Sequence, residues 1–131
     1  MTLQVELVSP ERVLFSGEAS MVTARTIGGG DIAFLTGHAP FIGALAIDQV
    51  IIRQTDGTDE VAAVHGGFVS VQDDRVKILS DLAELKDQID VNRARRAHEA
   101  AEAAARVDDD IEAEAGMRRA QARLKAAGAL D

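Results

Sequence analysis

The side chains that most often carry chemistry are few and scattered in this sequence. Three histidines lie far apart in the chain, at His38, His65 and His98, and none belongs to a His-Glu-x-x-His metal motif. A Gly-x-Ser-x-Gly elbow is absent, and without cysteine there is no thiolate ligand or disulfide. The acidic clusters at Asp73 and at 108–110 are typical of turns and helix caps. Distant residues can still converge in a fold, but the sequence favours neither a catalytic centre nor a metal site.

Three consecutive glycines at 28–30 could form a phosphate cradle or a corner of a β structure. A nucleotide cradle places its glycines between a strand and a helix N-terminus, where backbone amides meet the phosphate. Here the stretch DIAFL that follows alternates like a strand, and no Lys-Ser or Lys-Thr pair accompanies the glycines. We therefore expect a positive-φ turn at 28–30 and a second corner at Gly37 and Pro40. His38 lies at that corner, where its simplest role is a hydrogen bond to nearby backbone.

The composition limits the class of partner. The chain has 131 residues, a formal charge of −8 and a pI near 4.8, which suits one domain or one domain with a short appendage. Nucleic acid and anionic lipid both require a concentrated basic surface, so we expect neither to bind directly. No apolar run reaches the ~18 residues of a membrane span, and the N-terminus does not resemble a signal peptide. The sequence predicts a cytoplasmic protein whose partners are proteins.

The chain changes character near residue 87. Before it, short segments rich in β-branched residues alternate with turn residues, which is typical of a sandwich or barrel. The expected strands are LQVELV, SMVTARTI, DIAFL, QVIIRQT, EVAAVHG, GFVSVQ and RVKILS. In the last of these, Val76 and Ile78 share one face and Arg75 and Lys77 the other, as in a half-buried strand.

The remainder is rich in alanine, with fourteen alanines between residues 94 and 129. Apolar residues recur there at helical spacing, and Asp90 is a plausible N-cap. The acidic run 108–110 can end one helix and cap the next. Pairs four residues apart, Glu102 with Arg106 and Glu114 with Arg118, suit exposed helix faces. The residues expected on the apolar faces are Ala94, Ala97, Ala101, Ala104, Met117, Ala120, Leu124 and Ala127. The sequence thus predicts a helical hairpin after the strand domain.

Four motifs in register give the chain a family resemblance. They are ELVSPERVLFSGEA (6–19), GGGDIAFLTGHAPF (28–41), HGGFVSVQDDRVKILSD (65–81) and IDVNRA (89–94). Together they resemble the epsilon subunit of the bacterial F-type ATP synthase over residues 3–124. The resemblance implies a β-sandwich of about ten strands at 1–86 and a helix-turn-helix at 87–131.

The resemblance also implies a function. Such a subunit is a non-catalytic rotor part of the central stalk, at the cytoplasmic face of the cell membrane, that links the gamma subunit to the c ring and so couples proton flow to ATP synthesis. Asp31 and His38 would then contact the c ring. The helical hairpin would extend into the alpha/beta catalytic hexamer and inhibit ATP hydrolysis. The residues implied in that inhibition are Arg118, Arg119, Arg123 and Lys125.

Some members of this family bind ATP through an IDxxRA motif and arginines of the second helix. The motif is matched by Ile89, Asp90, Arg93 and Ala94. Asp90 would accept from the adenine amino group, Arg93 would contact the nucleotide, and Arg119 and Arg123 would supply the second helix. However, Ala100 stands where ATP-binding members carry another arginine, and the second helix is about three residues shorter. The resemblance therefore implies at most weak ATP binding as a regulatory ligand, with no other cofactor. Asp90 as an N-cap worth ~1 kcal/mol explains part of the motif without a ligand.

A second class of function stays open at this point. A free-standing β-sandwich that binds a small ligand, with a helical tail that controls access, fits the same elements. The sequence leaves the strength of inhibition, the coupling ion and the dominant hairpin position undetermined.

Overall fold

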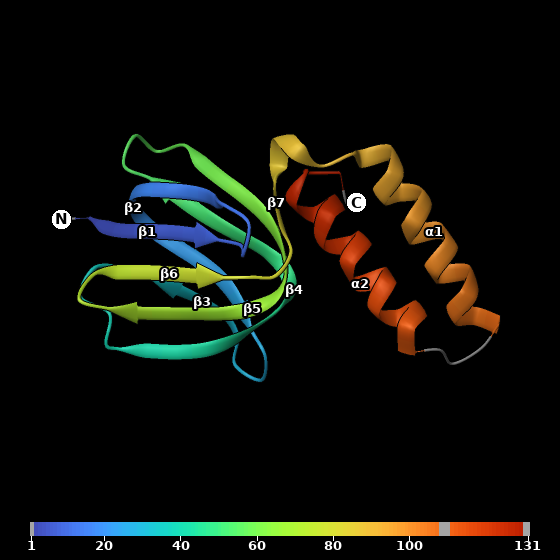
Figure 1. Cartoon of the computed structure of the whole chain (residues 1–131), viewed down its shortest axis with the longest axis horizontal. Helices are drawn as coiled ribbons and strands as arrows, with labels where there is room; N and C mark the ends of the chain where they lie inside the picture. The colour runs from blue at the N-terminus through green and yellow to red at the C-terminus, as the bar shows by residue number, and fades with distance from the viewer. Residues whose placement is uncertain (1, 108–110, 130–131) are drawn as a thin grey trace.

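The computed structural model describes residues 2–107 and 111–129, as a strand domain followed by two helices (Figure 1). Over these residues the strands are β1 (Leu3–Val8), β2 (Val13–Thr26), β3 (Gly30–Phe34), β4 (Phe41–Gln54), β5 (Asp59–Gln72), β6 (Arg75–Leu79) and β7 (Ala83–Leu85). A single turn of 3₁₀ helix (Lys86–Gln88) leads to α1 (Val91–Val107) and α2 (Ile111–Ala126). The predicted fold class, a β-sandwich followed by a helical pair, is confirmed.

The strands form a closed ring. β1 pairs in parallel with β6 and antiparallel with β2, and the order β1-β6-β5-β4-β2 returns to β1 through that second pairing. β3 extends the sheet from β2, and β7 pairs with β5. Closure leaves few free edges on which another strand could add.

The expected number of about ten strands is wrong, because the described residues form seven. β2, β4 and β5 are each 14 residues long and curve around the sandwich (Figure 1). The segments expected as separate strands, EVAAVHG and GFVSVQ, are consecutive parts of β5. β2 and β4 likewise begin earlier than their sequence patterns indicated. Long curved strands thus take the place of several short ones.

A glycine pair bends β5 in its middle. Gly66 and Gly67 have φ of +82° and +125°, which side chains rarely adopt. Before them β5 pairs with β7, and after them it pairs with β6. The Ser80 hydroxyl donates to the Gly66 carbonyl at 2.7 Å and fastens the bend. A Cβ on Gly67 would lie 2.0 Å from the Leu79 carbonyl oxygen, so only glycine fits.

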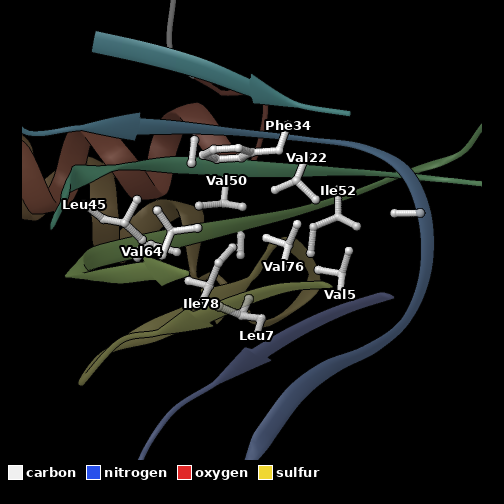
Figure 2. Packing of buried hydrophobic residues seen from close by; sticks show 14 of the residues in the cluster. Val5, Leu7, Val22, Phe34, Leu45, Val50, Ile52, Val64, Val76 and Ile78 are labelled. Atoms are coloured by element: carbon white, nitrogen blue, oxygen red, sulfur yellow. The ribbon is translucent and has the colours of Figure 1, made fainter. Parts of the chain in front are cut away.

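Inward-facing residues from all the ring strands fill the core. Figure 2 shows residues such as Val5, Val22, Phe34 and Val64 pointing into one interior. The predicted alternation in β6 is confirmed, since Val76 and Ile78 are buried and their neighbours in the strand are exposed. One face of the sheet is therefore used for the core, and the other is left for solvent or, on β4 and β5, for α2.

The helices begin and pair largely as predicted. The Asp90 carboxylate accepts from the Arg93 amide at 3.1 Å, which confirms the N-cap. Arg106 forms an ion pair with Glu102, also as predicted. The described residues show no ion pair joining Glu114 to Arg118. The cap predicted at 108–110 lies outside the described residues.

α2 lies between the sandwich and α1 (Figure 1). Its buried residues are Ala113, Ala120, Ala122, Leu124 and Ala126. On α1, Ala94 is buried as predicted, but Ala97 and Ala104 are exposed, because within the described residues α1 packs mainly against α2. The predicted apolar face of α1 is thus wider than the face that packs against α2.

The bend in β5 gives a stability prediction. Gly67→Ala should lower the free energy of unfolding by roughly 3 kcal/mol or more, because its Cβ would collide with backbone. Gly57→Ala is the matched control: Gly57 also has positive φ, +89°, but nothing lies within 4 Å of an added Cβ. It should lose only ~1 to 2 kcal/mol. Denaturant unfolding measures both, and equal losses would contradict a steric requirement at Gly67.

Candidate functional site

Asp31 and His38, the residues expected at one contact, lie toward opposite ends of β3, Asp31 within the start of the strand and His38 beyond its last residue. Asp31 is exposed beside the 28–30 turn, and its carboxylate is 3.9 Å from the Arg25 guanidinium. His38 lies past the other end of β3, next to the β5–β6 turn, where the Gly37 amide donates to the Asp74 carboxylate at 2.7 Å. The structure shows no direct contact that brings Asp31 and His38 together within its described residues.

The His38 ring has the structural role expected of it. Its Nδ1 is 2.7 Å from the Ala39 carbonyl oxygen, and the ring packs edge-on against Phe34 with centroids 5.0 Å apart. Phe41 completes this aromatic group, with its ring centroid 5.6 Å from that of Phe34 and 6.4 Å from that of His38. These contacts hold the corner at Gly37 and Pro40 in one shape.

The hairpin formed by α1 and α2 meets the sandwich through small side chains. Ala122 and Ala126 of α2 pack against Ala63 of β5. Ile47, Val61 and Ile89 border this group and are only partly buried. Each alanine buries a single methyl group, and a buried CH₂-sized group contributes ~0.8 kcal/mol. The apolar part of the hairpin contact is therefore modest.

Two ion-pair groups flank the alanine contact. The Arg123 guanidinium donates to the Glu84 carboxylate at 2.5 Å, and His65 Nε2 lies 3.3 Å from the same oxygen. On the other flank the Lys125 ammonium donates to the Asp48 carboxylate at 3.0 Å. These ion pairs connect α2 to β4 through Asp48 and to β7 through Glu84.

The pKa of His65 follows from this setting. Burial lowers it most and the Arg123 cation lowers it further, while the hydrogen bond and charge of Glu84 act in the opposite direction. Sequence reasoning did not single out His65, Glu84 or Asp48 for this contact, because their partners lie far away in the chain. The sequence signal that could have suggested them is a polar residue on the outward face of a strand.

A cleft of about 250 Å³ opens between the hairpin and β7. It is lined by Glu84, Gln88, Asp90, Arg93, Ala94, Ala97 and Arg123. Three of the residues implied in ATP binding, Asp90, Arg93 and Arg123, are thus brought together. The fourth, Arg119, points elsewhere and donates to Glu112 at 3.0 Å. At the cleft, the Arg123 guanidinium is paired with the Glu84 carboxylate.

The basic residues of α2 differ in whether they pair with a carboxylate. Arg119, Arg123 and Lys125 each pair with a carboxylate in this position of the hairpin. Arg118 is exposed and borders a small cleft together with Asp48 and Lys125. Most of the positive charge of α2 is therefore neutralised locally while the hairpin is docked.

An exposed apolar row crosses the outside of the ring, and sequence reasoning missed it. Strand register sets Ala44, Phe68, Leu79, Val8 and Val13 side by side on β4, β5, β6, β1 and β2. Phe68, Leu79 and Val13 are 59%, 47% and 58% exposed. We call these five residues the apolar row. Because their strand neighbours fill the core, the row faces outward.

A groove of about 390 Å³ runs beside the row, with Ser9 and Pro10 on one wall. Ile42, two residues before Ala44 in β4, is 79% exposed. A contiguous exposed apolar surface of this kind marks a protein contact more often than chance. Within the described residues there is no cluster of potential metal ligands, and neither helix is long and apolar enough to cross a membrane. The geometry is that of a strand domain with an exposed apolar surface and a helical pair attached through alanine contacts and ion pairs.

Comparison with known proteins agrees with this geometry. Residues 2–86 match the family described as ATP synthase, Delta/Epsilon chain, beta-sandwich domain. An ATP synthase epsilon chain of Streptomyces griseus is 48% identical over 124 residues, covering 95% of this chain and 94% of that protein. One from Micrococcus luteus is 48% identical over 85 residues, which are 65% of this chain and 92% of that protein.

A solved structure shares the fold as well. A chain in the cryo-EM structure of the Euglena gracilis mitochondrial ATP synthase, with OSCP, F1 and c-ring, matches with a TM-score of 0.83. The match covers 96% of this chain and 81% of that chain, at 24% identity. Since the family match spans the sandwich and the Streptomyces relative aligns over nearly its whole length, the chain belongs to the family of ATP synthase epsilon chains.

Proposed function

We propose that this chain is a rotor subunit in the central stalk of an F-type ATP synthase. It links the gamma subunit to the ring of c subunits, and so helps couple proton flow to ATP synthesis, without catalysing a reaction itself. The observation that carries this proposal is the identity of 48% with an epsilon chain over 94% of that relative. The chain would lie peripherally, at the cytoplasmic face of the cell membrane. The free-standing ligand-binding module has no comparable support.

The apolar row is the surface we assign to gamma. Phe68 is the one aromatic residue of the row and has Leu79, at the middle of the row, as its cross-strand neighbour. The groove beside Pro10 can accept a side chain of the partner. Aromatic residues in an apolar patch commonly dominate the binding energy. The hairpin packs against the other half of β5, so docking of α2 leaves the row free.

The c-ring contact would use the turns around Asp31 and His38. Asp31 is exposed and only loosely paired with Arg25, so it is available to a basic residue of a c-subunit loop. Such a rim pair adds ~0 to 1 kcal/mol. The His38 corner is held by Phe34 and would act mainly through its shape. We expect the turn beside Asp31 and the corner at His38 to form separate parts of one contact surface for the c ring.

The strand domain and the helical hairpin would have different functions. Residues 1–86 would dock on gamma and the c ring, and residues 87–131 would regulate. The Micrococcus relative, in which 85 matched residues make up 92% of the protein, supports a sandwich that is sufficient for docking. When released, α2 would present Arg118, Arg119, Arg123 and Lys125 to acidic surfaces of the alpha/beta hexamer and inhibit ATP hydrolysis.

A weak ATP site in the cleft is a second candidate function. It is favoured by the grouping of Asp90, Arg93 and Arg123 around one opening. The cleft, at about 250 Å³, is smaller than most nucleotide pockets, and the Glu84 carboxylate would repel phosphate. We therefore expect millimolar affinity at best.

The gamma surface can be tested by Phe68→Ser. Loss of the aromatic ring of the row should weaken gamma binding at least tenfold, or ~1.4 kcal/mol, while stability changes by less than ~0.5 kcal/mol because Phe68 is exposed. Ile111→Ser is the matched control, an exposed residue on α2 away from the row. Titration of each variant with purified gamma gives the affinities. Equal affinities for native chain and Phe68→Ser would refute the assignment.

Inhibition by the hairpin can be tested by ending the chain after Asp90. The assembled complex should then hydrolyse ATP faster, because the proposed obstruction is gone, and its subunit composition should be unchanged. The measurement is the steady-state hydrolysis rate of complexes with full and shortened chains. An unchanged rate in a fully assembled complex would rule out the inhibitory role.

The ATP site can be tested by calorimetric titration of the isolated chain. Weak binding is expected, and Arg93→Ala should reduce the affinity at least several-fold because that guanidinium lines the cleft. Arg95→Ala is the control, an exposed arginine of α1 that is not one of the lining residues. No heat at millimolar ATP, or equal binding by the two variants, would reject this site.

A further inference from the structure

The His65 ring is a buried titratable group at the hairpin contact for which the proposed function gives no role. Its side chain is 3% exposed. Glu84 of β7 faces it at 3.3 Å, and the guanidinium groups of Arg123 and Arg119 on α2 act on it by charge. Its Nδ1 is buried and has no hydrogen-bond partner among the described residues. An unpartnered polar atom at a contact that must open suggests a functional reason.

The neutral ring fits this setting and the charged ring does not. The Glu84 oxygen that accepts from Arg123 also lies within reach of His65 Nε2, so a neutral ring donates there and leaves a lone pair on Nδ1. Protonation would add a buried N–H with no acceptor. It would also place a second positive charge beside Arg123. Both effects oppose the docked position of α2.

We propose that His65 makes docking of the hairpin sensitive to pH, so that protonation of its ring in mildly acid solution releases α2 from the sandwich. Docking is a property of this chain alone. Only the consequence, a change in ATP hydrolysis, rests on the proposed function.

The direction of the pH effect follows from the pKa of His65 in the docked and in the released chain. In the docked state burial and the Arg123 cation hold the pKa of His65 below its usual value. When α2 leaves, both arginines leave with it and Glu84 stays, so the pKa returns to ~6.5 or above. The released state therefore binds the proton more tightly. The docking constant falls as pH drops below ~6.5, by up to tenfold per pH unit, until the pKa of the docked state is reached.

The chain has no cysteine, so two introduced cysteines can be labelled without interference. Glu18→Cys on β2 and Ala103→Cys on α1 are exposed positions on the sandwich and the hairpin. Distances between the labels, measured by pulsed electron paramagnetic resonance, give the docked and released populations of the full chain. Between pH 7.5 and 5.5 the ratio of docked to released chain should fall about tenfold.

His65→Gln keeps a donor toward Glu84 but does not titrate, so its ratio should stay constant over this range. His98→Gln is the matched control: His98 lies between the helices, 3.4 Å from the Gln121 amide nitrogen, and this variant should keep the full fall. A constant ratio in the native chain, or an undiminished fall in His65→Gln, would overturn the proposal.

A second readout covers the case in which His65→Gln does not dock at all. A proton NMR titration of the native full chain gives the pKa of His65 directly. We expect a midpoint below 6.5, because burial and the Arg123 cation lower the pKa of the docked ring. A midpoint at or above 6.5 would overturn the proposal. Neither measurement uses the ATP synthase, so both results stand apart from the outcome of the hydrolysis experiment.

Discussion

The bend at Gly66 and Gly67 is the constraint on which both outer surfaces depend. Before the bend, Ala63 and His65 face outward and meet α2. After it, Phe68 faces outward in the apolar row, while Val69 returns to the core. Without positive φ at these two positions, a single strand could not pair with β7 and then with β6 in this register. One backbone feature therefore assigns the two halves of β5 to different partners.

The hairpin is held by a contact that is easily perturbed. Its apolar part consists mainly of alanine methyl groups, and its ion pairs are partly exposed, where each typically contributes ~0 to 1 kcal/mol. A docking equilibrium of this size responds to changes of one or two kcal/mol. A single proton on a buried imidazole is a perturbation of that order. A leucine-rich contact in the same place would make the same proton inconsequential.

The sequence alone predicted those features whose causes are local. Alternation in β6 and the cap at Asp90 depend on residues within a few positions of each other, and both are confirmed. The continuity of β5 was missed because two glycines normally end a strand, and here a hydroxyl from Ser80 supports them. The pairs Glu84 with Arg123 and Asp48 with Lys125 join residues 39 and 77 positions apart. Such pairs follow from the topology of the ring, which no local pattern specifies.

The same charges that the resemblance implies for inhibition also hold the docked hairpin. Arg123 pairs with Glu84 and Lys125 with Asp48 while α2 lies on the sandwich, and these cations become available to another surface only when those pairs break. In the proposed function, removing either cation weakens both the docked and the inhibitory position of the hairpin, and the net effect on hydrolysis reports the difference between them. Removing Glu84 or Asp48 weakens the docked position alone. Substitution of the carboxylates on the sandwich thus separates two roles that substitution of Arg123 or Lys125 combines.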